Sequence, residues 1–133
     1  MADANVYKSR AVQKYLRIAP RKVRLVVDTV RGDNVEQALG KLSFTNKKGA
    51  PFVAKVIKSA AANLRDQYEE ESFEDEDLII KQIFVDEGPV LKRIQPAPMG
   101  RAHPIRKRTS HVTVEVETKK AEEEEEEFEL ETE

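Results

Sequence analysis

The chain has 133 residues, of which 39% are apolar and 36% charged, with no cysteine and a formal net charge of −2. This length and composition fit one domain with a modest core, and they leave no room for two ordinary domains. The absence of cysteine excludes disulfides, thiolate metal sites and a cysteine nucleophile. No apolar stretch approaches the roughly 20 residues of a membrane span, and the sequence around Asp3 lacks the apolar segment of a secretory signal. We therefore expect a soluble cytoplasmic protein without a membrane span.

The near-neutral total hides blocks of opposite charge. Residues 1–68 sum to +9 and residues 88–120 to +6, whereas residues 69–87 sum to −8 and residues 121–133 to −9. We expect residues 1–117 to form a single domain and residues 118–133 to form a disordered acidic tail, because a block of like charges cannot bury surface. The alternative is that the acidic tail screens the basic domain from non-specific polyanions, or keeps it soluble before assembly.

The first third of the chain predicts a strand followed by a helix. Residues 6–18 alternate loosely between apolar and polar side chains, which predicts a strand whose apolar parity is carried by Val6, Val12, Leu16 and Ile18. Pro20 suits a first helical position, and Gly32 suits a helix stop. Valines at helical spacing lie between them, so a helix is expected over about residues 20–31.

Two further helices are expected before the acidic block. Asn34 followed by Gln37 resembles a capping box, and it precedes a short amphipathic helix that ends near residues 42–44. The longest helix is predicted from near Lys48 to Gln67. Its expected apolar face consists of Phe52, Val53, Val56, Ile57, Ala60 and Leu64.

The rest of the chain predicts a loop, two strands and a long arm between them. Residues 69–77 are acidic and read as a loop, and residues 78–85 form the most strand-like segment. Residues 88–104 hold four prolines and two glycines. Residues 105–117 predict one continuous strand whose even positions change along its length from basic to apolar: Arg106, Arg108, Ser110, Val112, Val114 and Val116. The last two strands are therefore expected to form a hairpin with its base in the core and its arm outside.

Such an arm needs a partner. Ordering about 17 residues costs on the order of 20 to 30 kcal/mol of backbone entropy, and few apolar residues are available to offset that cost. An isolated two-stranded ribbon is also marginal in water. The arm is basic, so its partner is expected to be an anion, and we expect residues 88–104 to be unprotected in the isolated protein.

The sequence offers no catalytic constellation. Ser110 and His111 are neighbours in a predicted strand and so point to opposite faces, as do Asp86 and Glu87. Without cysteine, His103 and His111 lack partners at a metal-ligand spacing. The five glycines match neither a P-loop nor a dinucleotide fingerprint. We expect neither enzymatic activity, nor a metal, nor a cofactor.

Basic residues cluster at helix starts and along the arm, which suits contact with phosphate groups. For a single pair of bases an ordinary solvated surface is the simpler interpretation, and the bases of residues 17–24 could instead pair with the acidic loop. Consecutive bases at 106–108 point to both faces of the arm, which favours a partner that surrounds it. The clusters consist of Arg21, Lys22 and Arg24; Lys47 and Lys48; Lys92 and Arg93; and Arg101, Arg106, Lys107 and Arg108.

Seven segments, in order, resemble those of the large-subunit ribosomal protein twenty-two family in its bacterial form. Together they extend over nearly all of residues 6–117. They are RIAPRKVRLV (17–26), TNKKGA (45–50), SAAAN (59–63), IFVDEGP (83–89), KRIQP (92–96), GRAH (100–103) and KRTSHVTVEV (107–116).

The resemblance implies an α+β fold, with three helices packed on a small antiparallel three-stranded sheet and a long protruding β-hairpin at about residues 86–110. It implies a structural constituent of the large ribosomal subunit that binds large-subunit ribosomal RNA, aids assembly and lines the nascent-peptide exit tunnel. Implied partners are that RNA, neighbouring large-subunit proteins and the nascent polypeptide.

The resemblance also implies roles for individual residues. The expected RNA contacts are Arg17, Arg21, Lys22, Arg24, Lys47, Lys48, Lys92, Arg93, Arg101, His103, Arg106, Lys107 and Arg108. The expected tip of the tunnel hairpin is Gln95, Pro96, Ala97, Pro98, Met99, Gly100 and Arg101. The sequence departs from the family pattern twice: Ala97, Pro98 and Met99 stand where bases are usual, and the acidic tail follows Val116.

Two other classes of function compete with the ribosomal one. A DNA-binding architectural protein would insert its arm into a groove, but only Met99 and the prolines offer an apolar wedge at the tip. A protein-interaction module would instead depend on the acidic tail. Binding to duplex DNA and deletion of residues 118–133 distinguish these alternatives.

Overall fold

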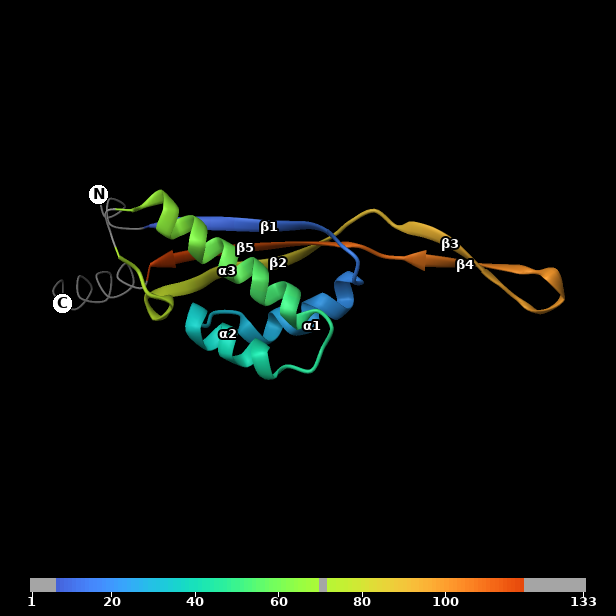
Figure 1. The fold of residues 1–133 in the computed structure, drawn as a ribbon, viewed down its shortest axis with the longest axis horizontal. Coiled ribbons are helices and arrows are strands. Elements are labelled where there is room, and N and C mark those ends of the chain that lie inside the picture. Colours follow the sequence, from blue (N-terminus) through green and yellow to red (C-terminus); the bar gives the residue numbers. More distant parts are fainter. Residues whose placement is uncertain (1–6, 70–71, 119–133) are drawn as a thin grey trace, which may run out of the picture.

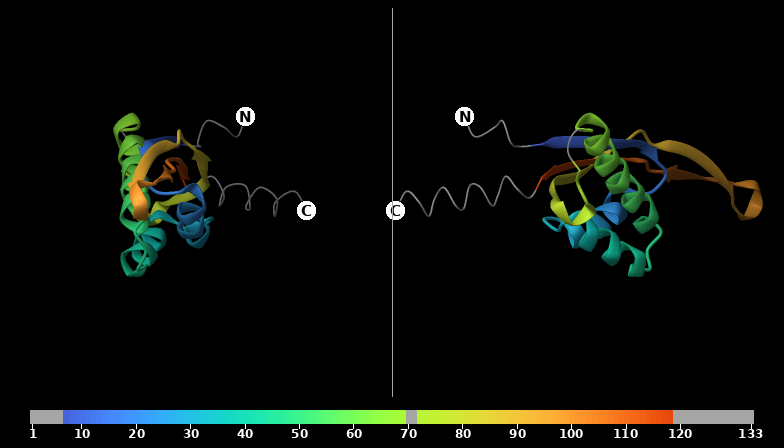
Figure 2. Two further views of the ribbon diagram at one scale, coloured as in Figure 1. Left: turned by 90° about the vertical axis from the view of Figure 1, so that its right-hand side faces the viewer. Right: turned by 60° about the vertical axis from the view of Figure 1, so that its left-hand side comes forward.

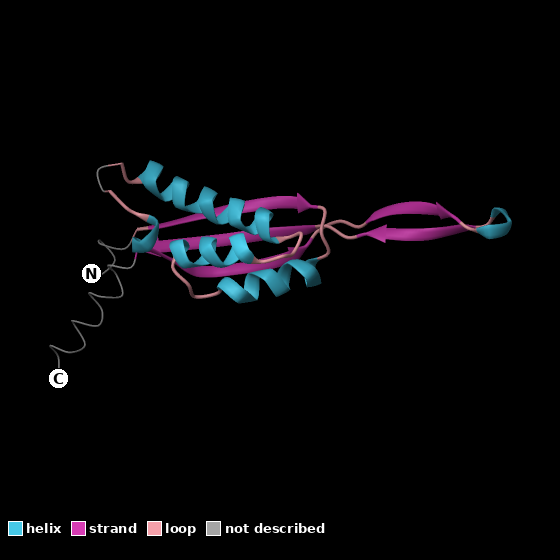
Figure 3. Cartoon of the chain, turned by 60° about the horizontal axis from the view of Figure 1, so that its bottom comes forward, coloured by secondary structure: helices cyan, strands magenta, loops and turns pink. Residues whose placement is uncertain are grey.

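The computed structural model describes residues 7–69 and 72–118. Three helices pack on one face of a three-stranded antiparallel sheet, and a two-stranded ribbon extends from one end of the domain (Figure 1). Figure 3 shows that this ribbon is separate from the main sheet, with only a narrow pair of connections between them. The predicted α+β fold with a protruding hairpin is confirmed.

Strand β5 (Ser110–Thr118) is the centre of the sheet. It pairs on one side with β1 (Lys8–Leu16) and on the other with β2 (Leu78–Glu87), both antiparallel, so the order is β1-β5-β2. The three valines of β5 predicted to face the core, at 112, 114 and 116, are fully buried. Strand β5 therefore holds the sheet together and supplies the middle of the core.

The helices lie where the sequence predicts them. Helix α1 (Pro20–Val30) packs on β2 and helix α3 (Ala50–Gln67) packs on β1 and β5, while α2 (Val35–Phe44) packs mainly on α3. The views in Figure 2 show the three helices gathered on one side of the sheet. Gly32 adopts a φ of +82° just after α1, a left-handed conformation that glycine tolerates best, and this confirms its predicted role as the helix stop.

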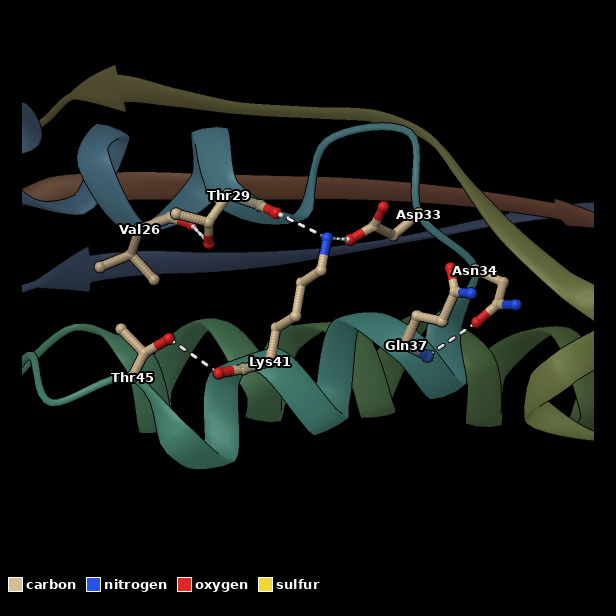
Figure 4. A network of polar contacts seen from close by, with 7 residues as sticks. All are labelled: Val26, Thr29, Asp33, Asn34, Gln37, Lys41 and Thr45. Carbon is tan, nitrogen blue, oxygen red and sulfur yellow. Dashed lines mark hydrogen bonds and ion pairs between the residues drawn. The ribbon is translucent and has the colours of Figure 1, made fainter.

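The turn between α1 and α2 is held by a small polar network, drawn in Figure 4. Asn34 caps α2, because its Oδ1 accepts a hydrogen bond of 2.7 Å from the backbone N–H of Gln37. Lys41 reaches back from α2 and donates to the Asp33 carboxylate at 2.7 Å and to the Thr29 carbonyl at 3.5 Å. These bonds fix the angle between the first two helices.

Two predicted orientations are wrong. Val12 is 46% exposed, and the buried residues early in β1 are instead Ser9 and Ala11. The parity changes because a bulge between Gln13 and Leu16 inserts an extra residue, with Tyr15 at a φ of +58°, so that Leu16 returns to the core. Phe52 is also exposed, since it lies beside the buried face of α3, whose first turn buries Ala50 and Val53 instead.

The acidic segment lies at the end of the domain opposite the hairpin (Figure 1). It contains a short 3-10 turn, η2 (Asp75–Asp77), closed by a reciprocal capping box between Glu74 and Asp77. Arg65 of α3 donates to the Phe73 carbonyl and pairs with the Asp75 carboxylate. This part of the negative charge is therefore neutralised from α3, far from the bases of α1.

The arm is a separate hairpin of β3 (Leu91–Pro96) and β4 (Ala102–Lys107), joined by the short turn η3 (Pro98–Gly100). The continuous strand predicted over residues 105–117 is wrong, because it is interrupted at Arg108 and Thr109 between β4 and β5. Thr109 and Ser110 are both buried although they are neighbours, so the alternation of faces does not continue through this point. The break lets the ribbon take its own twist and direction.

We predict that Asn34→Ala lowers the free energy of unfolding by about 1 kcal/mol, because it removes the only side-chain cap on the start of α2 that the described residues show. Urea unfolding followed by circular dichroism measures this change. Asn46→Ala, at an exposed position in the loop before α3, is the matched control and should cost less than about 0.5 kcal/mol. Equal losses in the two variants would contradict the role of the cap.

Candidate nucleic-acid interface

Three segments that are far apart in the sequence meet in one groove beside the start of the hairpin. The groove has a volume of about 830 Å³ and lies between the start of α1, the loop before α3 and the strands of the arm. We call it the basic groove, because eight of its lining residues are bases and none is acidic: Arg17, Lys22, Lys47, Lys48, Arg93, Arg106, Lys107 and Arg108.

The two helices that border the basic groove begin with positive charge. The first turns of α1 and α3 contain no acidic residue, and α1 carries Arg21 and Lys22 there, while Lys47 and Lys48 precede α3. The positive end of a helix dipole disfavours a nearby cation by about 0.3 to 1 kcal/mol, so this arrangement is unfavourable in isolation. An anion bound at the groove would interact favourably with both the bases and the helix ends.

None of the eight groove bases forms an ion pair within the described part of the chain. The ion pairs found there involve Arg31, Lys41, Arg65 and Lys81. The alternative in which the bases of residues 17–24 pair with the acidic loop finds no support, since Asp75 of that loop pairs with Arg65 instead. The positive charge of the groove thus remains without a counter-charge among residues 7–69 and 72–118.

The hairpin adds like charges across its two strands. Lys92 lies directly opposite Arg106 in the register of β3 and β4, and Leu91 lies opposite Lys107. Facing like charges destabilise a strand pair by some tenths of a kcal/mol, unless an anion lies between them. The basic arm is therefore better suited to being surrounded by anions than to standing free in water.

Hydrogen bonds close the root of the hairpin, residues 88–91 and 107–110, and connect it to the globular part. The Gly88 N–H donates to the Thr109 carbonyl at 2.9 Å, and the Thr109 hydroxyl donates to the Pro89 carbonyl at 2.6 Å. The fully buried Ser110 hydroxyl donates to the carbonyl of Ile18, just before α1. These bonds place the bases at 106–108 across from those of α1.

A second contact supports the root from the other side. The backbone N–H of Tyr15, in the bulge of β1, donates to His111 Nδ1 at 3.0 Å, and the two rings meet edge to face at 5.1 Å. Ser110 and His111 therefore make separate contacts on opposite sides of β5, as their neighbouring positions in a strand predict. They do not bond to each other as a nucleophile and base would.

The predicted RNA contacts divide into three groups. Eight of them line the basic groove. Arg21, Lys92, Arg101 and His103 are exposed outside its lining, the last three along the arm. Arg24 differs, because its guanidinium donates to the Val85 carbonyl at 3.0 Å and so braces the edge of β2 from α1.

The groove also contains apolar side chains that residue-by-residue interpretation of the sequence missed. Leu25 is 55% exposed on α1 and lines the groove together with Ile18, Leu91 and Ile105. An exposed leucine on the polar side of an amphipathic helix is the one signal in the sequence that could have identified this feature. The groove can therefore contact the apolar parts of a bound chain as well as its charges.

The tip of the hairpin is a tight turn of different character. Met99 and Gly100 adopt φ angles of +66° and +71°, and the Ala97 N–H donates to the Arg101 carbonyl at 2.7 Å to close the turn. Met99 is 97% exposed. The turn at residues 97–100 thus presents a thioether and a proline ring, and Arg101 directly after it is the base nearest to the turn.

Within the described residues, no group of three or more His, Asp or Glu side chains is placed to hold a metal ion. None of the helices described is both long enough and apolar enough to cross a membrane.

A small α+β domain with a groove lined by eight bases and with a basic arm has the charge pattern that is typical of proteins that bind polyanions. The sequence matches the model of the family described as ribosomal protein L22p/L17e over residues 11–117. The chain therefore belongs to this ribosomal family, whose members are structural proteins and not enzymes.

Individual proteins of this family are similar to the chain over most of its length. The large ribosomal subunit protein uL22 of Desulfitobacterium hafniense strain Y51 is 54% identical over 109 residues, which cover 82% of this chain and 93% of the relative. The protein of the same name from Thermus thermophilus is 53% identical over 107 residues, covering 80% of this chain and 92% of the relative. That from Desulforamulus reducens is 50% identical over 109 residues, covering 82% and 94%.

We predict that Gly88→Ala destabilises the root of the hairpin by about 1 to 3 kcal/mol, because there is no space for a Cβ atom at this position. The added atom would overlap with Thr109 Oγ1 and lie 3.2 Å from the His111 ring. Thermal unfolding measures the loss, and the NMR signals of Tyr15 and His111 should shift with it. Gly40→Ala in α2 is the control, since a Cβ meets open space there, and it should be neutral or stabilising.

Proposed function

We propose that this chain, a structural constituent of the large ribosomal subunit in the bacterial cytoplasm, binds large-subunit ribosomal RNA through the basic groove and the arm. In doing so it helps the RNA to assemble, and it carries the tip of its hairpin to the nascent-peptide exit tunnel. The observation that carries the proposal is the basic groove itself, with eight bases from three segments and no acid in its lining.

The chemistry of the groove suits the phosphates of a folded RNA. Eight bases on two sides of a concave surface can neutralise several phosphates at once, and each contact releases condensed counterions. If all eight act, log K should fall with log salt at a slope of about −6 to −7. The apolar side chains beside Leu25 offer a surface on which the ribose and the faces of bases can pack.

The positions of the bases on the arm favour a folded RNA over a partner with a flat surface. Arg106 and Lys107 are consecutive in β4, so their side chains point to opposite faces of the ribbon, and Arg108 follows at the break before β5. Phosphates are then needed on more than one side of the arm, which a folded RNA supplies when it encloses a protein extension. Neighbouring large-subunit proteins are the second kind of partner that this placement implies.

The uncharged turn at the tip of the hairpin favours contact with a nascent polypeptide. Between the arm's bases and Arg101, the turn at residues 97–99 carries no charge, and its most exposed side chain is Met99. Methionine is flexible and adapts to varied apolar surfaces. Such a tip suits a nascent chain of any sequence better than it suits a phosphate backbone.

We predict that Arg106→Ala with Lys107→Ala lowers affinity for large-subunit ribosomal RNA roughly tenfold or more at low salt and reduces the salt slope by about 2. Filter binding over a series of salt concentrations measures both. The matched control is Lys55→Ala with Lys58→Ala, which removes two exposed bases of α3 outside the groove.

The proposed RNA site is wrong if the two double variants lose the same affinity and slope. Duplex DNA of equal length should bind more weakly than the ribosomal RNA, and DNA binding of equal strength would instead favour the architectural DNA protein.

We predict that a photo-reactive amino acid at Met99 crosslinks to a nascent polypeptide in assembled ribosomes, because Met99 is the most exposed apolar side chain at the tip. The same group at Phe44, which is 92% exposed on α2, is the control and should not crosslink. Equal labelling from both positions, or from neither at any nascent-chain length, would rule out the proposed contact at the tip.

A further inference from the structure

The described part of the chain carries a large excess of positive charge. Residues 7–69 and 72–118 contain 21 Lys and Arg against 13 Asp and Glu. The described acids do not neutralise the basic groove, since none lines it and the ion pairs lie elsewhere. Eight bases around one groove repel one another until an anion binds there.

The chain also contains a segment of opposite charge, which lies outside the described residues. Residues 121–133 contain nine glutamates and no base. The last seven, EFELETE, alternate glutamate with Phe128, Leu130 and Thr132. In an extended conformation this pattern presents carboxylates on one side and apolar groups on the other, which matches a groove that combines bases with Leu25, Ile18, Leu91 and Ile105.

The length of the acidic tail allows it to return to the groove. Strand β5 runs from Ser110, next to the groove residue Thr109, to Thr118 at the far end of the sheet. Nine strand residues span about 27 to 30 Å. The 15 residues from 119 to 133 can extend to about 50 Å, so positions from about Glu127 onward can reach the groove.

Strand β1 connects the far end of the sheet with the groove. Strand β1 begins beside the end of β5, where Lys8 lies opposite Glu117, and it leads to Arg17 in the groove. Along β1 the side chains of Lys8, Arg10 and Lys14 are exposed. Lys8 and Arg10 face Glu117 and Glu115 in the sheet register, so positive charge without a facing acid begins at Lys14 and continues at Arg17 in the groove.

We propose that the acidic tail folds back along β1 and occupies the basic groove of its own chain, so that the free protein carries an internal competitor for RNA. This inference rests on the proposed RNA-binding function of the groove and adds its regulation. A tethered segment acts at an effective concentration in the millimolar range, which suffices against weak, non-specific RNA. Large-subunit RNA contacts the arm as well as the groove, so it displaces the tail.

The first test compares two variants of the full chain with equal changes in charge. One neutralises the tail at Glu127, Glu129, Glu131 and Glu133 by Glu→Gln. The control neutralises four exposed acids outside the groove, with Glu36→Gln, Asp66→Asn, Glu69→Gln and Glu76→Gln. At low salt the tail variant should bind a short polyuridine RNA at least about fivefold more tightly than the control variant does, and the difference should vanish at high salt.

The second test locates the tail by zero-length carbodiimide crosslinking of the unaltered protein. Tail glutamates should join Lys22, Lys47, Lys48 or Lys107 within one molecule, and not Lys55 or Lys58 on α3. Crosslinks between two molecules, seen by mixing isotopically labelled and unlabelled protein, would overturn the intramolecular contact. So would equal RNA affinity of the tail and control variants.

The two proposals fail in different ways. If Arg106→Ala with Lys107→Ala loses RNA binding but the tail variant matches its control, only the internal competitor is wrong. If the Arg106 and Lys107 variant binds ribosomal RNA as the unaltered protein does, the function of the groove itself is wrong.

Discussion

The hydrogen bond from the Ser110 hydroxyl to the Ile18 carbonyl connects the root of the hairpin to the globular part of this molecule. It lies at the one point where the central strand β5 begins, the hairpin ends and the chain enters α1. Both groups are withdrawn from water, so leaving either unpaired would cost about 1 to 3 kcal/mol. Together with the Gly88 and Thr109 backbone pair, this bond sets the direction in which the arm leaves the domain.

Charge is separated along the same axis. The acidic segment near η2 and its partner Arg65 lie at one end of the sheet, while the bases of α1, of the loop before α3 and of the arm gather at the other. Folding brings the bases together in spite of their repulsion, because the apolar faces of α1 and α3 pack on the sheet. The packing of the core thus keeps these bases close together, although their mutual repulsion is unfavourable until an anion binds among them.

The helices and the core end of the central strand follow directly from the sequence, since their apolar residues recur at helical and strand spacing, whereas the break before Ser110 does not. The alternation along β1 predicts the wrong face for Val12, because the bulge at Tyr15 changes the parity of the strand and nothing local in the sequence marks a bulge at a residue other than glycine. Arg24 looked like its neighbours, yet only the packing of α1 on β2 shows that it bonds to the Val85 carbonyl. The basic groove was predicted as separate clusters, because its assembly from three segments depends on the topology.

The groove and the arm share residues, so a ligand bound in the groove also affects the direction of the arm. Arg93, Arg106 and Lys107 belong to the arm, whereas Arg17, Lys22 and Lys47 belong to the globular part, and both sets line the same groove. An RNA segment that neutralises both sets also bridges them, and it opposes any bending at the break between β4 and β5. The hydrogen bonds at residues 88, 109 and 110 and the contact between Tyr15 and His111 hold a narrow root, to which the proposed RNA would add a further connection. In the proposed function, occupation of the groove therefore also restrains the arm and the direction in which its tip points.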